Sequence, residues 1–274
     1  MKISEILEAM AVVEIAFMPI TIVLSAFYNL LGMIMGLMLG VIVFAVIAMM
    51  AGRRILKCQR ARLVDPEEHQ ELYEALREVT RKANVKMPRL VLVPAGIPNS
   101  FTTGMGSDNA VLALTYGTLR NLNIEEIKAL MGHEVGHMMN GDVLPYTVAS
   151  FLSGVLVSIP LRLGKTRGVF FELFARPAGW IIKIATNPED ELAADYRALP
   201  LVGKDPLISA LRKIENAVEL RPLKEGNPAL APLYAVNPFK GLEWAKAFSH
   251  HPPTEERIYY IEEAWREMNE GGGD

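Results

Sequence analysis

The segment His133-Glu134-Val-Gly-His137 contains the residue types from which proteins build a divalent-metal site. Residues four apart lie on one face of a helix, so both imidazoles can bind one ion. Glu134 follows the first histidine and can take a proton from a water molecule on that ion. The chain has five histidines, so chance occurrence of this spacing is on the order of one in a hundred. The motif predicts Zn²⁺-dependent hydrolysis.

A catalytic zinc needs a third protein ligand and an open position. Glu191 and Asp195 are four residues apart and share a predicted helix face. We expect Glu191 to bind the metal and Asp195 to accept a hydrogen bond from a ligand imidazole. By spacing alone, Glu189 and Asp190 are alternative candidates for the third ligand. If no metal is bound, these acidic residues would simply form the solvated start of a helix.

Local sequence signals place the first two histidines on a helix. Asn123 and Glu126 predict a capping box at its start, and Gly141 predicts its end. Gly132 and Gly136 disfavour a helix by roughly 1 kcal/mol each, which is tolerable where another backbone or a substrate approaches closely.

Short strands and further helices are expected around that helix. The pattern predicts a strand over 89–93 and a hairpin over 99–115, whose open edge could pair with an extended peptide. Asp65-Pro66 predicts one helix start, Asp205-Pro206 another, and Thr254 the start of the last helix.

The N-terminal part is too apolar for a soluble domain. The chain is 51% hydrophobic with a mean hydropathy of +0.21, and 15–52 lacks Asp, Glu, Lys and Arg. As one helix this run would be roughly 57 Å long, against a hydrocarbon core of roughly 30 Å. Two membrane spans, roughly 9–28 and 33–52, with a fold-back at 29–32, fit better. A cleaved signal peptide is disfavoured, since glutamates replace its basic start and a second apolar stretch follows.

The charges beyond the second span indicate orientation. Five basic residues come before any acidic one: Arg53, Arg54, Lys57, Arg60 and Arg62. Basic segments stay on the cytoplasmic side, so the catalytic part is expected there. The single cysteine, Cys58, excludes an intrachain disulfide and suits a reducing cytoplasm. A net charge of −3 does not favour a nucleic-acid partner.

A second apolar region, 143–186, separates His137 from Glu191. All three ligands must meet at one ion, so this region crosses the membrane twice or not at all. Two crossings, about 143–161 and 169–186, would place Arg162, Lys165 and Arg167 outside and Glu172 and Arg176 within a span, which the charges disfavour. The alternative is a hairpin that dips into the cytoplasmic membrane face or lies on it.

Several motifs together resemble the HtpX-like membrane gluzincins, relatives of the CAAX prenyl proteases. The resemblance covers nearly the whole chain and rests on NSFTTG at 99–104, HEVGHMMNGD at 133–142, ELAAD at 191–195 and HPPTEERI at 251–258. It implies that His133, His137 and Glu191 bind zinc and that Glu134 is catalytic. It also implies that two apolar hairpins give four spans, which makes two crossings of 143–186 the preferred prediction. It further implies that His251 lies near the site and stabilises the tetrahedral intermediate; the alternative is that His-Pro-Pro only directs the chain into the last helix.

The sequence thus predicts a mainly α integral membrane protein with an α+β zincin-type catalytic domain and a small sheet. Four segments are expected: a transmembrane hairpin 1–52, catalytic parts 53–142 and 187–274, and the second hairpin 143–186. The predicted function is a zinc endopeptidase of membrane or misfolded proteins, active in quality control and stress responses at the plasma or inner membrane. The alternatives are a prenyl-protein protease and a membrane scaffold with a zinc site, and the oligomeric state stays open.

Overall fold

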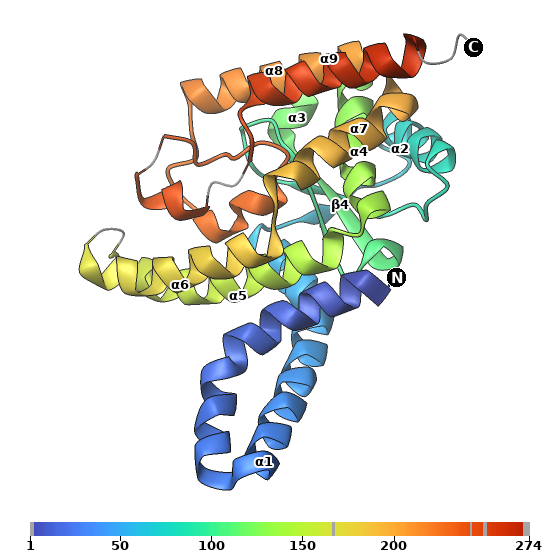
Figure 1. Ribbon diagram of the computed structural model, residues 1–274. Helices are drawn as coiled ribbons and strands as arrows, with labels where there is room; N and C mark the ends of the chain where they lie inside the picture. Colours follow the sequence, from blue (N-terminus) through green and yellow to red (C-terminus); the bar gives the residue numbers. More distant parts are fainter. Residues whose placement is uncertain (1–2, 166–167, 242, 249–250, 271–274) are drawn as a thin grey trace.

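A computed structural model describes residues 3–165, 168–241, 243–248 and 251–270. A helical hairpin projects from a larger body, and two further helices lie crosswise at its base (Figure 1). The mainly helical class with a small sheet is confirmed. Among the described residues, two helices are long and apolar enough to span a membrane, Ile3–Cys58 and Val143–Arg162.

The projecting hairpin is α1 (Ile3–Cys58), which folds back at Asn29. Asn29 has φ 52°, ψ −133° and separates the two arms at the expected position. Glycines bring the arms together: a Cβ on Gly36 would lie 2.6 Å from Thr21 Oγ1, and one on Gly40 would lie 2.4 Å from Glu14 Oε1. Small residues at this spacing are typical of closely packed membrane helices. Glu14 of the first arm therefore lies against Gly40 of the second arm.

The sheet has four strands in the order β1-β2-β4-β3: β1 (Arg62–Leu63), β2 (Arg89–Val93), β4 (Ala110–Thr115) and β3 (Ser100–Gly104). The predicted hairpin is β3 and β4, which pair antiparallel with Phe101 opposite Ala113. β2 runs parallel to β4, a long-range pairing that periodicity does not indicate. β3 therefore forms one edge of the sheet.

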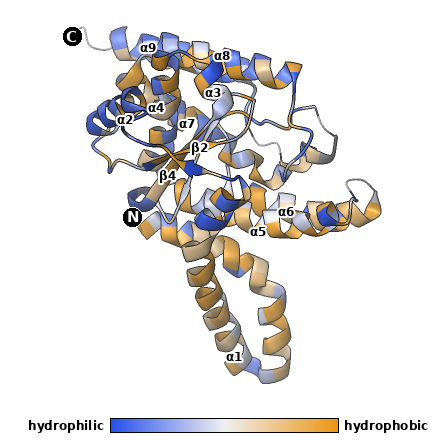
Figure 2. Cartoon of the chain, turned by 180° about the vertical axis from the view of Figure 1, so that it is seen from behind, coloured by the Kyte–Doolittle hydropathy of each residue, from blue (hydrophilic) through white to orange (hydrophobic). Residues whose placement is uncertain are grey.

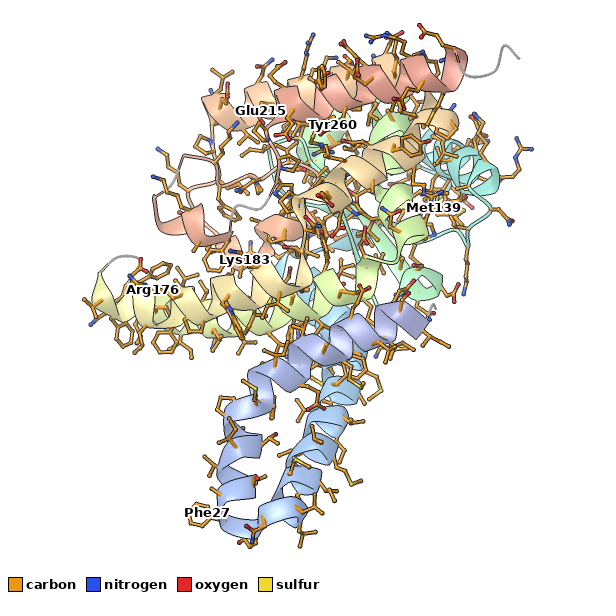
Figure 3. All side chains as sticks on the ribbon, viewed as in Figure 1. Phe27, Met139, Arg176, Lys183, Glu215 and Tyr260 are labelled. Carbon is orange, nitrogen blue, oxygen red and sulfur yellow. The ribbon has the colours of Figure 1, made fainter. Side chains whose placement is uncertain are left out.

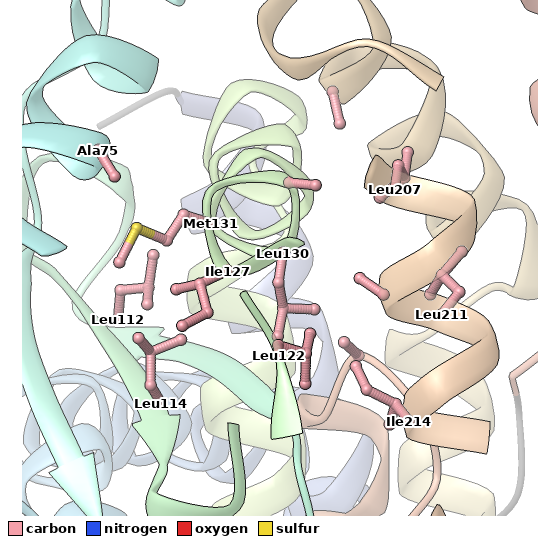
Figure 4. Packing of buried hydrophobic residues seen from close by; sticks show 14 of the residues in the cluster. Ala75, Leu112, Leu114, Leu122, Ile127, Leu130, Met131, Leu207, Leu211 and Ile214 are labelled. Atoms are coloured by element: carbon pink, nitrogen blue, oxygen red, sulfur yellow. The ribbon is translucent and has the colours of Figure 1, made fainter. Parts of the chain in front are cut away.

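Helices α2 (Gln70–Lys82), α3 (Tyr116–Asn121), α4 (Ile124–Asn140), α7 (Pro188–Val202), α8 (Lys204–Leu220) and α9 (Thr254–Glu270) surround the sheet. Leu112 and Leu114 of β4 pack with Leu130 and Met131 of α4 in the main core, which α8 joins through Leu211 (Figure 4). The helix predicted at Asp65 begins later, at Gln70, because Asp65 Oδ1 accepts the Glu67 amide at 2.9 Å in a turn.

α4 and α7 pack backbone to backbone. A Cβ on Gly136 would lie 2.4 Å from the Ala194 carbonyl oxygen, and one on Gly132 would lie 2.8 Å from Val202 Cγ1. The close approach expected at these glycines is therefore made by α7. It brings the face of α7 that carries Glu191 against the face of α4 that carries the two histidines.

The second apolar region forms α5 (Val143–Arg162) and α6 (Val169–Ala185). α5 packs against both arms of α1 at their base, through Leu144 and Val148 with Ala9, Val13 and Ala51 among others. The 3₁₀ helices η2 (Pro228–Leu233) and η3 (Glu243–Phe248) cover the opposite side of α5 and α6, where Ala229, Ala245 and Phe248 join the same core as Phe171. Hydrophobic residues continue from α1 along α5 and α6 (Figure 2).

Candidate metal centre

His133, His137 and Glu191 converge where α4 meets the start of α7. Their ligand atoms lie within 4.8 Å of one another. His133 Nε2 is 3.5 Å from Glu191 Oε2, and His137 Nε2 is 3.6 Å from Glu191 Oε1. All three residues are buried: His133 is 0% exposed, His137 9% and Glu191 4%. The structure therefore brings together the three residues that were expected to form one site.

This geometry fits a tetrahedral metal ion. Ligand atoms at 2.0–2.1 Å from such an ion lie about 3.3–3.4 Å apart, close to the separations here. His133 Nε2 is buried and makes no hydrogen bond within the described residues. Buried polar atoms normally have a partner. Two imidazole nitrogens and a carboxylate form a donor set that suits Zn²⁺.

Each ligand imidazole is held by a carboxylate through its other nitrogen. His133 Nδ1 lies 2.8 Å from Asp195 Oδ1, and His137 Nδ1 lies 2.8 Å from Asp142 Oδ2. These hydrogen bonds fix the ring orientations and direct both Nε2 atoms toward Glu191. Asp195 has the position expected for it, whereas Asp142 was not expected to take part. The sequence feature that could have pointed to Asp142 is its position directly after Gly141, the residue whose αL conformation ends α4.

The two competing acidic residues on α7 point elsewhere. Asp190 caps the start of α7 by accepting the Asn187 amide at 3.0 Å, and it also accepts the Tyr146 hydroxyl at 2.8 Å. Glu189 is exposed. Neither belongs to the cluster of possible ligands, so Glu191 is the carboxylate that the geometry supports.

Arg257 of α9 completes the ion pairs below the site. Its Nε donates to Asp195 Oδ2 at 2.7 Å, and its Nη1 lies 3.2 Å from Glu191 Oε2. Arg257 is 1% exposed and Asp195 is 2% exposed. Burial acts to raise the pKa of Asp195, but Arg257 and His133 outweigh this effect and hold it below its ordinary value. Arg257 is therefore a buried partner of Asp195 and not a surface residue.

We expect Arg257→Met to destabilise the fold strongly. It leaves Asp195 buried without its cation, and breaking a buried pair in this way costs about 3–5 kcal/mol. Arg266→Met is the matched control, since Arg266 is on the same helix and pairs with Glu263 at 2.7 Å with its side chain 58% exposed. An exposed pair contributes about 0–1 kcal/mol. Thermal unfolding in detergent compares the two variants, and equal midpoints would contradict the assignment.

Glu134 lies beside the three ligands and is 1% exposed. Ser100 of β3, which is fully buried, donates its hydroxyl to Glu134 Oε1 at 2.5 Å. Burial raises the pKa of Glu134 to about 7, against the opposing effects of His137 and the Ser100 hydrogen bond. A carboxyl with such a pKa is suited to receive and return a proton near neutral pH. Sequence reasoning did not identify Ser100, because no local pattern links it to Glu134.

We expect Ser100→Ala to lower kcat about 10- to 100-fold, because a hydrogen bond to a charged group contributes about 1.5–3 kcal/mol. The hydroxyl is directed at Glu134, so KM and metal content should stay near the wild-type values. Thr103→Val is the control in the same strand, since its hydroxyl faces Thr147 at 3.0 Å. A raised KM with unchanged kcat in Ser100→Ala would show that Ser100 does not position Glu134.

The electrostatics of the site favour a cation. Burial acts to lower the pKa of His137, but the hydrogen bond to Asp142 and the charge of Glu191 outweigh it and raise this pKa to about 9. Burial lowers the pKa of His133. The same negative charge that keeps a proton on His137 would also attract a divalent ion. The ion would replace that proton, since metal ligation requires a neutral imidazole.

His251 lies beside the site. Its Nε2 is 2.6 Å from the Tyr234 carbonyl oxygen and 3.7 Å from Glu191 Oε1. Burial and the charge of Arg257 lower its pKa to about 4. Nδ1 is buried and has no hydrogen-bond partner within the described residues. This position agrees with the expected proximity of His251, and its role in the reaction stays a prediction.

We expected an open edge at β3, but another part of the chain covers it. Tyr234 forms an antiparallel bridge with Phe101, and the Ala235 amide donates to the Ser100 carbonyl at 3.0 Å. Asn99 donates its side-chain amide to the Val236 carbonyl at 2.6 Å. We call this segment, 234–236, the edge segment. It covers the part of β3 next to Glu134, so a peptide could pair there only after the edge segment leaves.

Comparison with known proteins gives consistent results. A model of peptidase family M48 matches residues 66–265. A protease HtpX homolog of Thermococcus sibiricus is 37% identical over 74% of this chain and 77% of its own length. The homolog of Pyrococcus abyssi is 36% identical over 78% and 80%. That of Persephonella marina is 33% identical over 90% and 95%.

Proposed function

Because this chain belongs to peptidase family M48, we propose that its metal is Zn²⁺ and that His133, His137 and Glu191 hold it. The chain is a membrane metalloendopeptidase, as the family and its HtpX relatives establish. The observation that carries the proposal is the convergence of two imidazole nitrogens and one carboxylate within 4.8 Å. Among the common divalent ions, zinc is the one that this donor set suits. Three protein ligands leave the fourth tetrahedral position open for water or substrate.

When bound, Zn²⁺ acts as a Lewis acid that polarises a carbonyl group and lowers the pKa of a water molecule to about 7. Glu134 takes the proton of the attacking water and delivers it to the leaving amine. Ser100 orients the Glu134 carboxylate, while Asp195 and Asp142 fix the two imidazoles. His251 lies beside Glu191, and its Nε2 donates to the Tyr234 carbonyl; once it leaves that carbonyl, it can donate a hydrogen bond to the substrate carbonyl as negative charge develops there.

For the membrane, the proposal is that the two arms of α1 cross the bilayer and the catalytic part is cytoplasmic. The arms expose apolar side chains along most of their length, among them Phe27, Leu37 and Ile42 (Figure 3 labels Phe27 near the fold-back). The basic residues from Arg53 onward follow the second arm on the side of the catalytic body. A catalytic part held next to the bilayer suits membrane or misfolded proteins as substrates.

Detergent-purified protein tests the activity. We expect about one zinc ion per chain and cleavage of casein or an unfolded membrane protein, with loss of cleavage on chelation and return on zinc addition. A farnesylated peptide with a C-terminal CAAX sequence separates the prenyl-protein alternative. Cleavage of that peptide alone would contradict the general endopeptidase, and full activity without metal would contradict the mechanism.

The native cysteine tests the orientation without any substitution. Cys58 ends α1 and is exposed. A membrane-impermeant maleimide should therefore fail to label it in intact cells and should label it after permeabilisation. An Asn29→Cys, Cys58→Ser variant places the only thiol at the fold-back and should react from outside. Labelling of Cys58 in intact cells would overturn the cytoplasmic placement.

A further inference from the structure

α6 has three distinct faces along its length. Phe171, Ala175, Ala178 and Ile182 are buried against the protein. The exposed charged residues form a second face: Glu172, Arg176 and Lys183 (Arg176 and Lys183 are labelled in Figure 3). A third face is apolar yet exposed, with Val169 88%, Leu173 67%, Trp180 52% and Ile184 39% exposed. The spacing of these four residues follows the helical repeat, so they form one stripe.

α5 also carries exposed apolar residues. Val155, Ile159 and Leu163 are 49%, 41% and 61% exposed, although most of α5 is buried. Arg162 and Lys165 are exposed at the end of α5 nearest the turn to α6. The α5–α6 hairpin thus combines an apolar surface with flanking cations, a pattern typical of helices that lie in a membrane interface.

The packing of α5 against α1 fixes the depth of this hairpin. α5 contacts the second arm at Phe44, Ile47, Ala48 and Ala51. Counted from the fold-back at Asn29, about 20 residues cover the roughly 30 Å hydrocarbon core, which places the cytoplasmic boundary near residue 49. Arg53 follows within a turn and a half. α5 therefore meets α1 at the level where the second arm leaves the hydrocarbon core.

The α5–α6 hairpin is poorly suited to crossing. It lies crosswise to the arms of α1 (Figure 1). In addition, 67% of the most apolar 18 residues of α5 are buried inside the protein. A crossing by α6 would carry Glu172, Arg176 and Lys183 into the bilayer, where a charged side chain costs about 2.5–3.5 kcal/mol on insertion scales. Arg176 Nε instead donates to Glu172 Oε2 at 3.2 Å on the surface of the helix.

We propose that the α5–α6 hairpin lies in the cytoplasmic face of the membrane as an interfacial surface. Its partner is an anionic lipid bilayer, with the stripe of α6 in the headgroup–acyl boundary and the basic residues at the phosphates. Trp180 has the amphipathic ring that favours this depth. The proposal rests on the membrane insertion of α1 proposed above, and it replaces the two crossings preferred from sequence.

The fluorescence of Trp180 tests the depth of the stripe. A Trp244→Phe, Trp265→Phe variant keeps Trp180 as the only tryptophan and is reconstituted into vesicles of phosphatidylcholine and phosphatidylglycerol. Acyl chains that carry spin labels near the headgroup should quench Trp180 more than chains labelled near the bilayer centre, since an interfacial helix is buried about 5–10 Å. Stronger quenching by the central label would show a crossing, and absence of quenching would show no lipid contact. Either result overturns the proposal.

A second reporter separates this proposal from the insertion of α1. Met38 is 62% exposed midway along the second arm, so Met38→Trp in a background without other tryptophans should be quenched most by the central label. If Met38→Trp is not quenched, the insertion of α1 fails, whatever Trp180 shows. Lys165→Cys with Cys58→Ser adds an independent result: protection from an impermeant maleimide is expected, and labelling from outside would show two crossings.

Discussion

Glu134→Gln should retain its metal and fold but lose peptide cleavage by about 10²- to 10⁴-fold, the usual contribution of a general base. The glutamine has almost the same shape as glutamate but accepts no proton from the attacking water. It can still accept the Ser100 hydrogen bond, so the local packing of β3 against α4 should change little. Metal content, thermal midpoint and kcat on an unfolded substrate measure the three parts of this expectation.

Glu125→Gln is the matched control for that variant. Glu125 lies on α4 like Glu134, but its side chain is 63% exposed and faces Lys128 at 3.9 Å. The same charge is removed from the same helix, and kcat should stay near the wild-type value. Wild-type kcat in Glu134→Gln would exclude Glu134 as the base, and loss of metal in that variant would assign it to the ligand set instead.

Glu191→Ala should lose zinc from the purified protein. Two imidazoles alone leave the ion with half of its tetrahedral ligands. Removing a residue that only supports a ligand costs about 10- to 100-fold in metal affinity, so removing a ligand should cost more. The variant also deprives Arg257 of one of its two carboxylates. Zinc analysis after dialysis against a weak chelator measures the result, together with the loss of cleavage.

Glu189→Ala is the control two residues earlier on α7. Glu189 is exposed in the first turn of that helix, and its amide is capped by Asn187 at 3.2 Å. This variant should keep zinc and activity. If Glu189→Ala lost zinc and Glu191→Ala kept it, the register of α7 at the site would be wrong. Loss in both would indicate that the start of α7 had unfolded.

The parts that local sequence predicts are those in which neighbouring residues determine the geometry. The capping box of Asn123 and Glu126 and the αL turn at Gly141 are short-range patterns, and both have the expected form. The spacing of His133 and His137 on one helix follows from the same helical geometry. The small residues Gly132 and Gly136 indicated a close neighbour without identifying it as α7.

Long-range contacts were not predictable in the same way. Ser100 meets Glu134 because the strand order places β3 beside α4, and no spacing in the chain encodes that meeting. The edge segment pairs with β3 across more than 130 positions of sequence. The direction of α5 and α6 depends on packing against α1 and η2, whereas hydropathy reports only how apolar a segment is. The four-span pattern of the family that the sequence resembles favoured two crossings of 143–186, and the number of crossings stays a prediction.

If substrates pair with β3, as expected from the sequence, the edge segment competes with them for the same part of that strand. It is tethered beside β3, held there by Arg257, which donates to the Ala235 carbonyl at 2.5 Å, and by the contact of His251 with the Tyr234 carbonyl. A tethered segment competes at an effective concentration on the order of mM. A short peptide at micromolar concentration would rarely displace it.

A long unfolded chain competes better, because contacts elsewhere on the protein or membrane raise its own local concentration. The resting protein would then spare folded neighbours and small peptides while cleaving extended polypeptides. Selectivity of this kind depends on the length and disorder of the substrate rather than on its side chains. The same segment would make latency a property of the resting fold, with no separate inhibitor required.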